Sequence, residues 1–205
     1  MNVQIRPADT TDTAAIPLIY SAGPPAFDYI FGTRRRSALD FLTQAFPRTG
    51  SLLSFDNHVV AEVEDQVLGC GAFYDGPDYD RRSKQLLLEI VRTYGWQAPG
   101  VIRRSLQFSQ VVRRPDNNSV YLNHLGVAPE SRGLGIGKRL LEYGIALAKS
   151  RGRRTFSLDV ALDNPRAQQL YERMGLNVVS EHAFKPTGTN VPNGRRMELL
   201  IEAHT

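Results

Sequence analysis

Several short stretches of alternating or β-branched hydrophobic residues predict strands. Val3 and Ile5 alternate with polar neighbours and predict a first strand. The runs 58–63 and 67–74 lie on either side of three polar residues, which is the pattern of an antiparallel hairpin. The same signals predict further strands over 119–127, 155–161, 178–184 and 196–201.

Hydrophobic residues at helical spacing predict helices between these strands. A first helix begins near Thr10 or Thr11, whose hydroxyls can cap it, and a second begins at about Arg34. Another follows the strand at 119–127 and a glycine-rich turn. The last helix opens at Asn164 and ends before Gly175, which supplies a stop signal.

The stretch from about 75 to 118 differs in composition from the rest and predicts a mostly helical insertion. Between Arg81 and Arg114 it holds seven arginines and one lysine against a single acid, Glu89. This excess is larger than the net charge of +4 of the whole chain, so the remainder is slightly acidic. Two interpretations stay open, a solvated helical face and a docking surface for an acidic partner or substrate.

Length and composition describe one globular domain over residues 1–205, because 41% of the residues are hydrophobic and 22% are charged. The longest strictly apolar runs span only about four residues, whereas a membrane-spanning helix needs about 20. The N-terminus lacks the apolar stretch of a secretory signal. The single Cys70 provides neither a disulfide nor a multi-cysteine metal site. We therefore expect a cytoplasmic protein that uses no metal and contacts no membrane.

The segment Ser131 to Leu141 carries the strongest chemical signal. Its glycines at 133, 135 and 137 stand between a strand end and a helix start, where bare backbone N–H groups bind phosphate. Arg132, Lys138 and Arg139 add positive charge. This arrangement predicts a ligand with a di- or triphosphate-like group.

Two common phosphate-binding motifs do not fit this segment. In a Walker A loop, Arg132 would replace the first glycine and Arg139 the Ser/Thr that holds magnesium. The dinucleotide fingerprint requires glycine where Leu140 stands, although Asp159 lies about where a ribose-binding acid would be. These departures argue against a nucleoside-triphosphate hydrolase and leave a nicotinamide enzyme as an alternative.

The pattern R-x-x-G-x-G, filled by Arg132, Gly135 and Gly137, resembles motif A of the GNAT superfamily of acyl-CoA-dependent N-acyltransferases. The resemblance extends to the opening IRPAD, the segments 125–129 and 164–171 and the triplet at 174–176, and so spans the chain except the insertion. It implies an α/β fold with a mixed central sheet flanked by helices. The helical insertion would lie between strands three and four.

The resemblance also implies acetyl-CoA as cosubstrate, held where strands four and five splay apart. The pantetheine arm would pair with one strand like an added strand, and the pyrophosphate would lie on the loop amides. Residues at the cofactor-binding positions are Leu125, Gly126, Val127, Arg132, Gly133, Leu134, Gly135, Ile136, Gly137, Lys138 and Asn164. For Asn164 a purely structural role as a helix cap is an equal alternative.

Tyr171 occupies the position of the tyrosine that, in many members of the family, protonates the departing CoA thiolate. We therefore expect it to act as general acid. It also shares a helix face with Ala167, Leu170 and Met174, which is the pattern of a core tyrosine.

The sequence offers more than one candidate for the general base. Asp159 matches a position at which some protein N-terminal acetyltransferases of the family have Glu, and Glu62 in the hairpin is another candidate that a solvated face explains as well. Strict strand alternation places Tyr121, Asn123 and Leu125 on one face, so we expect His124 on the opposite face in a structural role.

These inferences favour an N-acetyltransferase that transfers acetyl to a primary amine, on a small molecule or a peptide, by direct attack in a ternary complex. Cys70 between two glycines is expected to be a small buried residue rather than an acyl carrier, and the amide near Val127 is expected to polarise the thioester carbonyl. The alternative is a non-catalytic acyl-CoA-binding regulatory module that docks an acidic partner through the insertion. Nucleic-acid binding is not favoured, because the arginines lack interleaved aromatic residues. A homodimer is expected by analogy alone.

Overall fold

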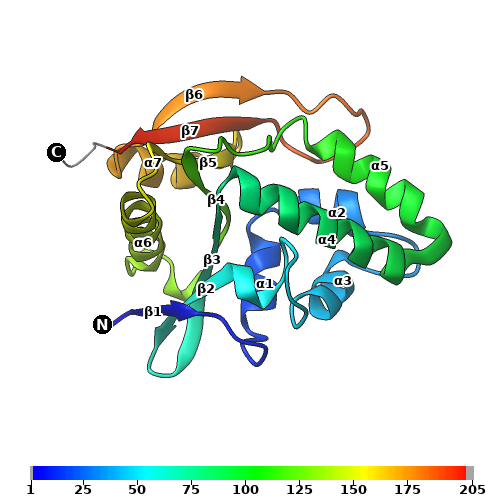
Figure 1. The fold of residues 1–205 in the computed structure, drawn as a ribbon, viewed down its shortest axis with the longest axis horizontal. Coiled ribbons are helices and arrows are strands. Elements are labelled where there is room, and N and C mark those ends of the chain that lie inside the picture. Colours follow the sequence, from blue (N-terminus) through cyan, green and yellow to red (C-terminus); the bar gives the residue numbers. More distant parts are fainter. Residues whose placement is uncertain (1, 202–205) are drawn as a thin grey trace.

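The computed structural model describes residues 2–201 and contains one seven-stranded mixed sheet (Figure 1). The strands are β1 (Gln4–Pro7), β2 (His58–Val63), β3 (Gln66–Tyr74), β4 (Ser119–Val127), β5 (Thr155–Ala161), β6 (Asn177–His182) and β7 (Gly194–Leu200). Their order in the sheet is β1-β2-β3-β4-β5-β7-β6. The pair β4–β5 is parallel and the other pairs are antiparallel. The α/β class and the hairpin at β2–β3 are therefore confirmed.

Helices cover both faces of the sheet (Figure 1). On one face lie α1 (Ala15–Ser21), α2 (Pro24–Phe31), α3 (Ala38–Ala45), α4 (Gly76–Tyr94) and α5 (Ala98–Phe108). On the other face lie α6 (Ile136–Ser150) and α7 (Pro165–Arg173). Single 3₁₀ turns occur at Phe55–Asn57, Gly95–Gln97 and Pro129–Ser131. The helical insertion between the third and fourth strands is confirmed as α4 and α5.

The N-terminal helices begin later than the sequence predicts. The first begins at Ala15, and α3 begins at Ala38, where Ser37 and Asp40 form a reciprocal capping box. The helix α2 was not predicted, because Pro24 and Pro25 were not recognised as its first turn. Proline fits that position because the first helical N–H groups have no intrahelical acceptor.

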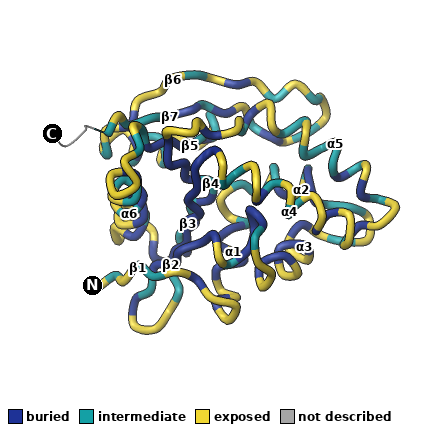
Figure 2. The backbone as a smooth tube through the Cα atoms, in the orientation of Figure 1, coloured by how far each residue is buried: buried dark blue, intermediate teal, exposed yellow. Residues whose placement is uncertain are grey.

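Two hydrophobic cores lie on the two sides of the sheet (Figure 2). One forms where α1 to α5 pack on the face that carries Val60 and Cys70, and the other where α6 and α7 pack on the face that carries Phe73 and Phe156. Burial of this apolar surface is the main favourable contribution to folding. Among residues 2–201, no helix is both long and apolar enough to cross a membrane.

The arginines of the insertion are largely engaged within the fold. Arg82 pairs with Asp56 and Asp78, at 3.0 Å in each case, and Arg114 pairs with Asp80 at 2.8 Å. The Arg104 guanidinium donates to the Ile30 carbonyl at 3.1 Å and so ties α5 to α2. Part of the positive charge therefore stabilises the attachment of the insertion to the domain.

Two buried histidines stack beneath the N-terminal helices. The rings of His58 and His124 lie 5.6 Å apart and nearly parallel, and Nδ1 of His58 lies 2.8 Å from the Ser54 carbonyl oxygen. Burial lowers the pKa of His58 to about 4 and holds that of His124 well below its usual range. Both rings are therefore neutral at pH 7.

Replacing Gly126 by alanine should destabilise the fold. A Cβ atom at this position would lie 2.1 Å from the carbonyl oxygen of Leu18 in α1, so the helix must move away from β4. We expect the free energy of unfolding in urea to fall by about 1–3 kcal/mol or more. The matched control is Gly100→Ala in α5, where the nearest atom is 3.8 Å away and stability should stay equal or rise slightly. Equal stability of the two variants would contradict the close approach of α1.

The histidine pair should make stability fall on acidification. Between the unfolded pKa of about 6.5 and the lower native values, the unfolded chain binds protons that the native state excludes, so stability is lost as the pH decreases. Each histidine contributes a slope of up to about 1.4 kcal/mol per pH unit. Urea titrations from pH 7 to pH 4 should show a smaller slope for His58→Asn than for the wild type. Identical slopes would rule out a neutral buried His58.

Candidate functional site

The parallel strands β4 and β5 separate halfway along their length. Residues 119–122 of β4 pair with residues 155–158 of β5, and beyond this point β5 continues its pairing with β7 alone. The remainder of β4 keeps its pairing with β3. An opening therefore lies between the second halves of β4 and β5, and a cavity lies on each side of it.

The first cavity lies on the α6 and α7 side and is called the α6 cavity. Its volume is about 520 Å³. The sequence-predicted residues that line it are Leu125, Val127, Arg132, Gly133, Gly135, Ile136, Gly137, Lys138, Asp159, Asn164 and Tyr171. Two predicted residues do not line it: Gly126 faces α1, and Leu134 projects into solvent with 51% of its surface exposed.

Backbone atoms of the glycine-rich loop form one end of the α6 cavity. Gly133 and Gly135 have φ angles of +87° and +85°, and no atom lies within 4 Å of where a Cβ would be. The first helical hydrogen bond runs from the Arg139 amide to the Gly135 carbonyl at 3.0 Å, so the amides of 136–138 precede the helical ladder. The helix has neither a side-chain cap nor an acidic residue in its first turn. Such an end suits an anion.

Four cationic side chains line the α6 cavity. Arg132 and Lys138 were expected from the loop, and Arg166 and Arg173 on α7 were not predicted. The last two are seven residues apart and so lie on one face of the helix. The seven-residue spacing of these arginines, on the helix that carries Tyr171, is visible in the sequence and could have predicted that both line the cavity. Among residues 2–201, the only carboxylate that lines the cavity is Asp159.

The Tyr171 side chain lies in the hydrophobic core beneath α6 and α7 and borders the α6 cavity. Only 7% of its surface is exposed, and its hydroxyl makes no hydrogen bond to another group of residues 2–201. Burial raises the pKa of Tyr171 to about 12, so the hydroxyl keeps its proton at neutral pH. The residue is therefore a core tyrosine that also borders the cavity.

Asp159 lies in a hydrogen-bonded cluster. Its Oδ2 accepts from the Tyr121 hydroxyl at 2.8 Å, and Arg196 donates to Oδ1 at 2.9 Å and to Oδ2 at 2.8 Å. Side-chain exposures of 5% for Asp159 and 10% for Arg196 show that this is a buried, paired charge. Asn164 accepts the Ala167 amide at 3.1 Å, which confirms its structural role as the cap of α7.

A β-bulge in β4 reverses the predicted direction of His124. Three steps along β4, from Leu122 to Leu125, face two steps along β3, so one extra residue interrupts the alternation. Tyr121 and His124 consequently line one cavity, whereas Leu125 lines the other. The expectation that Leu125 shares the Tyr121 face and that His124 points away is therefore wrong.

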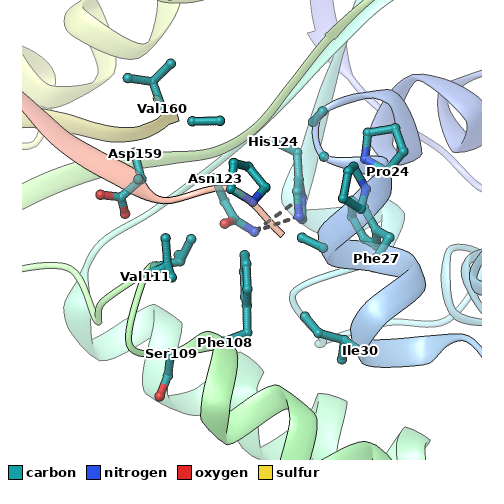
Figure 3. Close-up of a pocket in the computed structure, with 18 of the residues that line it drawn as sticks. Pro24, Phe27, Ile30, Phe108, Ser109, Val111, Asn123, His124, Asp159 and Val160 are labelled. Atoms are coloured by element: carbon teal, nitrogen blue, oxygen red, sulfur yellow. Dashed lines mark hydrogen bonds between the residues drawn. The ribbon is translucent and has the colours of Figure 1, made fainter. Parts of the chain in front are cut away.

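The second cavity, called the α2 cavity, has a volume of about 350 Å³. The α2 helix supplies Phe27 and Ile30, the insertion supplies Phe108 and Val111, and Asn123 and His124 form its floor on β4 (Figure 3). The amide nitrogen of Asn123 lies 2.9 Å from Nε2 of His124. The insertion is thus part of this cavity, which the sequence did not predict.

The two cavities meet at the separation of β4 and β5. Seven residues line both of them, namely Ser21, Ala22, Asn123, Asp159, Val160, Ala161 and Asn164. A ligand from each side can therefore meet its counterpart at this junction. The geometry suits a transfer between two separately bound molecules.

Two other candidates lie outside both cavities. Glu62 pairs with Arg6 at 2.6 Å across β1 and β2. Cys70 is fully buried, its Sγ lies 4.0 Å from the Ala15 carbonyl oxygen, and burial raises its pKa to about 12. The expected burial of Cys70 is confirmed, and its thiol is not a nucleophile in this environment.

Comparison of the sequence with known proteins gives a consistent family. Residues 28–176 match the profile of the acetyltransferase (GNAT) family. Over 105 residues the chain is 34% identical to the protein named 5-NmdU N-acetyltransferase of Pseudomonas phage PaMx11, which covers 48% of this chain and 71% of that protein. An uncharacterised N-acetyltransferase of Methanocaldococcus jannaschii is 41% identical over 54 residues, covering 26% of this chain and 24% of that protein.

Solved structures show the same fold at low sequence identity. An N-acetyltransferase from Staphylococcus aureus aligns with a TM-score of 0.70 and 20% identity over 96% of this chain and 100% of that chain. A polyamine N-acetyltransferase from Drosophila melanogaster aligns with a TM-score of 0.58 and 17% identity over 98% of this chain and 100% of that chain. Together with the family profile and the phage relative, these findings show that the chain belongs to the GNAT family of acetyltransferases.

Proposed function

We propose that this acyltransferase moves an acetyl group from acetyl-CoA to a primary amine by direct attack in a ternary complex. Members of the family act on amines and generally use acetyl-CoA. The observation that carries the proposal is the junction of two cavities where β4 and β5 separate. One cavity is lined by cations, and the lining of the other contains no lysine or arginine among residues 2–201. One molecule would enter from each side.

The α6 cavity fits the cosubstrate. The unpaired loop amides and the four cations would hold its phosphates, and the edge of β4 at 125–127, which β5 has left, offers backbone groups to the pantetheine arm. When bound, acetyl-CoA supplies the acetyl group as a thioester. The amide near Val127 would polarise the thioester carbonyl. The buried state of Cys70 supports direct transfer rather than an acyl-enzyme route.

Tyr171 would protonate the leaving thiolate. Its raised pKa keeps the hydroxyl protonated before the reaction, and the hydroxyl lacks a competing partner among the described residues. A thiolate is a stronger base in an apolar surrounding than in water, which favours proton transfer to it. Tyr171 can thus pack in the hydrophobic core and also donate a proton in the reaction.

Asp159 is the proposed acceptor of the amine proton, since no other carboxylate of the described residues lines both cavities. Its two oxygens accept three hydrogen bonds from Tyr121 and Arg196. Neutral His124, which the bulge turns into the α2 cavity, is the second candidate.

The regulatory-module alternative gains no support from the insertion. Its Arg81, Arg82 and Arg114 pair with Asp56, Asp78 and Asp80, and its α5 helix forms a wall of the α2 cavity. These contacts favour a role in holding the acceptor over a role in docking an acidic protein.

Tyr171→Phe should lower kcat by about 10²-fold or more while the Kd for CoA stays within about twofold, because only a proton donor is lost. The matched control is Tyr143→Phe on α6, which packs against Phe73 and lines neither cavity. Thiol release and calorimetric titration measure the two quantities. Full activity of Tyr171→Phe would overturn its assignment as general acid.

Arg132→Ala should weaken CoA binding by about tenfold, and the loss should shrink as salt is added, because an exposed charge contact to phosphate is screened. Arg139→Ala serves as the control, since Arg139 flanks the same loop and is exposed but does not line the cavity. Calorimetry at two salt concentrations gives both affinities. Equal losses in the two variants would show that the loop attracts CoA only through its overall charge.

A further inference from the structure

We infer that the acceptor is a small primary amine with an uncharged, apolar body, such as an arylalkylamine, and that the cavity disfavours polyamines and amino-acid carboxylates. The inference rests on the proposed function and narrows it to one substrate class. It is drawn from the chemistry of the α2 cavity, whose lining sorts into a polar floor and apolar walls.

The α2 cavity has almost no charge to offer a second charged group. Within the part of the chain that the structure describes, its lining contains no lysine, arginine or glutamate. The carboxylate of Asp159 is neutralised by Arg196, and Asp163 is exposed to solvent in the turn after β5. Burial holds His124 neutral, as described above. A carboxylate would therefore enter without a partner, which is unfavourable, and a second ammonium would find one only in the solvent-exposed Asp163.

The walls of the cavity are apolar and come from elements on two sides. Phe27 and Ile30 of α2 face Phe108 and Val111 at the end of the insertion (Figure 3). The hydroxyl of Ser109 donates to the Leu106 carbonyl at 2.7 Å, so it is already satisfied within the chain. These side chains suit an aromatic or branched hydrocarbon body.

One group of polar side chains lies on β4 and β5. Asn123 and Asp159 lie at the junction with the α6 cavity, and His124 lies beside Asn123 in the α2 cavity. Other polar side chains of the lining, such as Ser105 and Ser109, come from the insertion. An acceptor would therefore direct its single amine toward the junction and its apolar body toward α2 and α5. The volume of about 350 Å³ is at the lower end of the range for small-molecule sites, about 300–1,000 Å³.

A panel of amines tests this assignment with the full-length protein and acetyl-CoA. We expect kcat/KM for 2-phenylethylamine and benzylamine to exceed that for spermidine, agmatine and phenylalanine by at least about tenfold. The assignment would be overturned if agmatine or spermidine reacted as well as the arylalkylamines, or if phenylalanine were preferred over 2-phenylethylamine. CoA binding is measured in parallel by calorimetry. If CoA binds and no arylalkylamine reacts, the assignment of acceptor class is wrong, whereas absent CoA binding refutes the proposed function itself.

Two variants locate the acceptor in the α2 cavity. Phe108→Ala should raise KM for 2-phenylethylamine by about fivefold or more with little change in kcat, while Leu106→Ala, on the same helix but outside this cavity, should leave both unchanged. Ser105→Glu adds a carboxylate to the lining. It should lower the preference for 2-phenylethylamine over agmatine by about tenfold. An unchanged preference in Ser105→Glu, with an unchanged KM in Phe108→Ala, would place the acceptor elsewhere.

Discussion

The separation of β4 and β5 is the constraint on which the rest of the site depends. Parallel strands that stayed paired to their ends would close the sheet between the two cavities. The pairing stops after Leu122 and Leu158, and β5 continues against β7, so its backbone groups remain satisfied on that side. The facing edges of both strands are left without a strand partner beyond this point, and the edge of β4 is the one to which the proposed function assigns the cosubstrate.

Close packing on both sides keeps this opening in place. On one face, Gly126 lets α1 lie directly on β4, and on the other, Gly144 lets α6 lie against the rings of Phe73 and Phe156. A side chain at either glycine would push a helix away from the sheet. The glycines within the strand and helix thus serve packing, whereas those at 133 and 135 serve the loop conformation.

Charge is distributed unequally between the two cavities. The lining of the α6 cavity includes four cations and helix amides, while that of the α2 cavity combines hydrocarbon walls with the paired Asp159 and the exposed Asp163. The two sides of one junction therefore differ in charge. The insertion supplies apolar residues such as Phe108 and Val111 to the α2 cavity, whereas its Arg82 and Arg114 pair with Asp56, Asp78 and Asp80.

The sequence by itself determined the α/β class, the insertion and the phosphate-type loop, because these depend on local periodicity and on residues adjacent in the chain. Tertiary structure alone decided the direction of His124, since a bulge is a mismatch between two strands and one strand does not reveal it. The pairing of Asp159 with Arg196, 37 residues apart, likewise exists only after folding. The α2 cavity could not be predicted from the sequence, because α2, α5 and the sheet, which are distant in the chain, form it jointly.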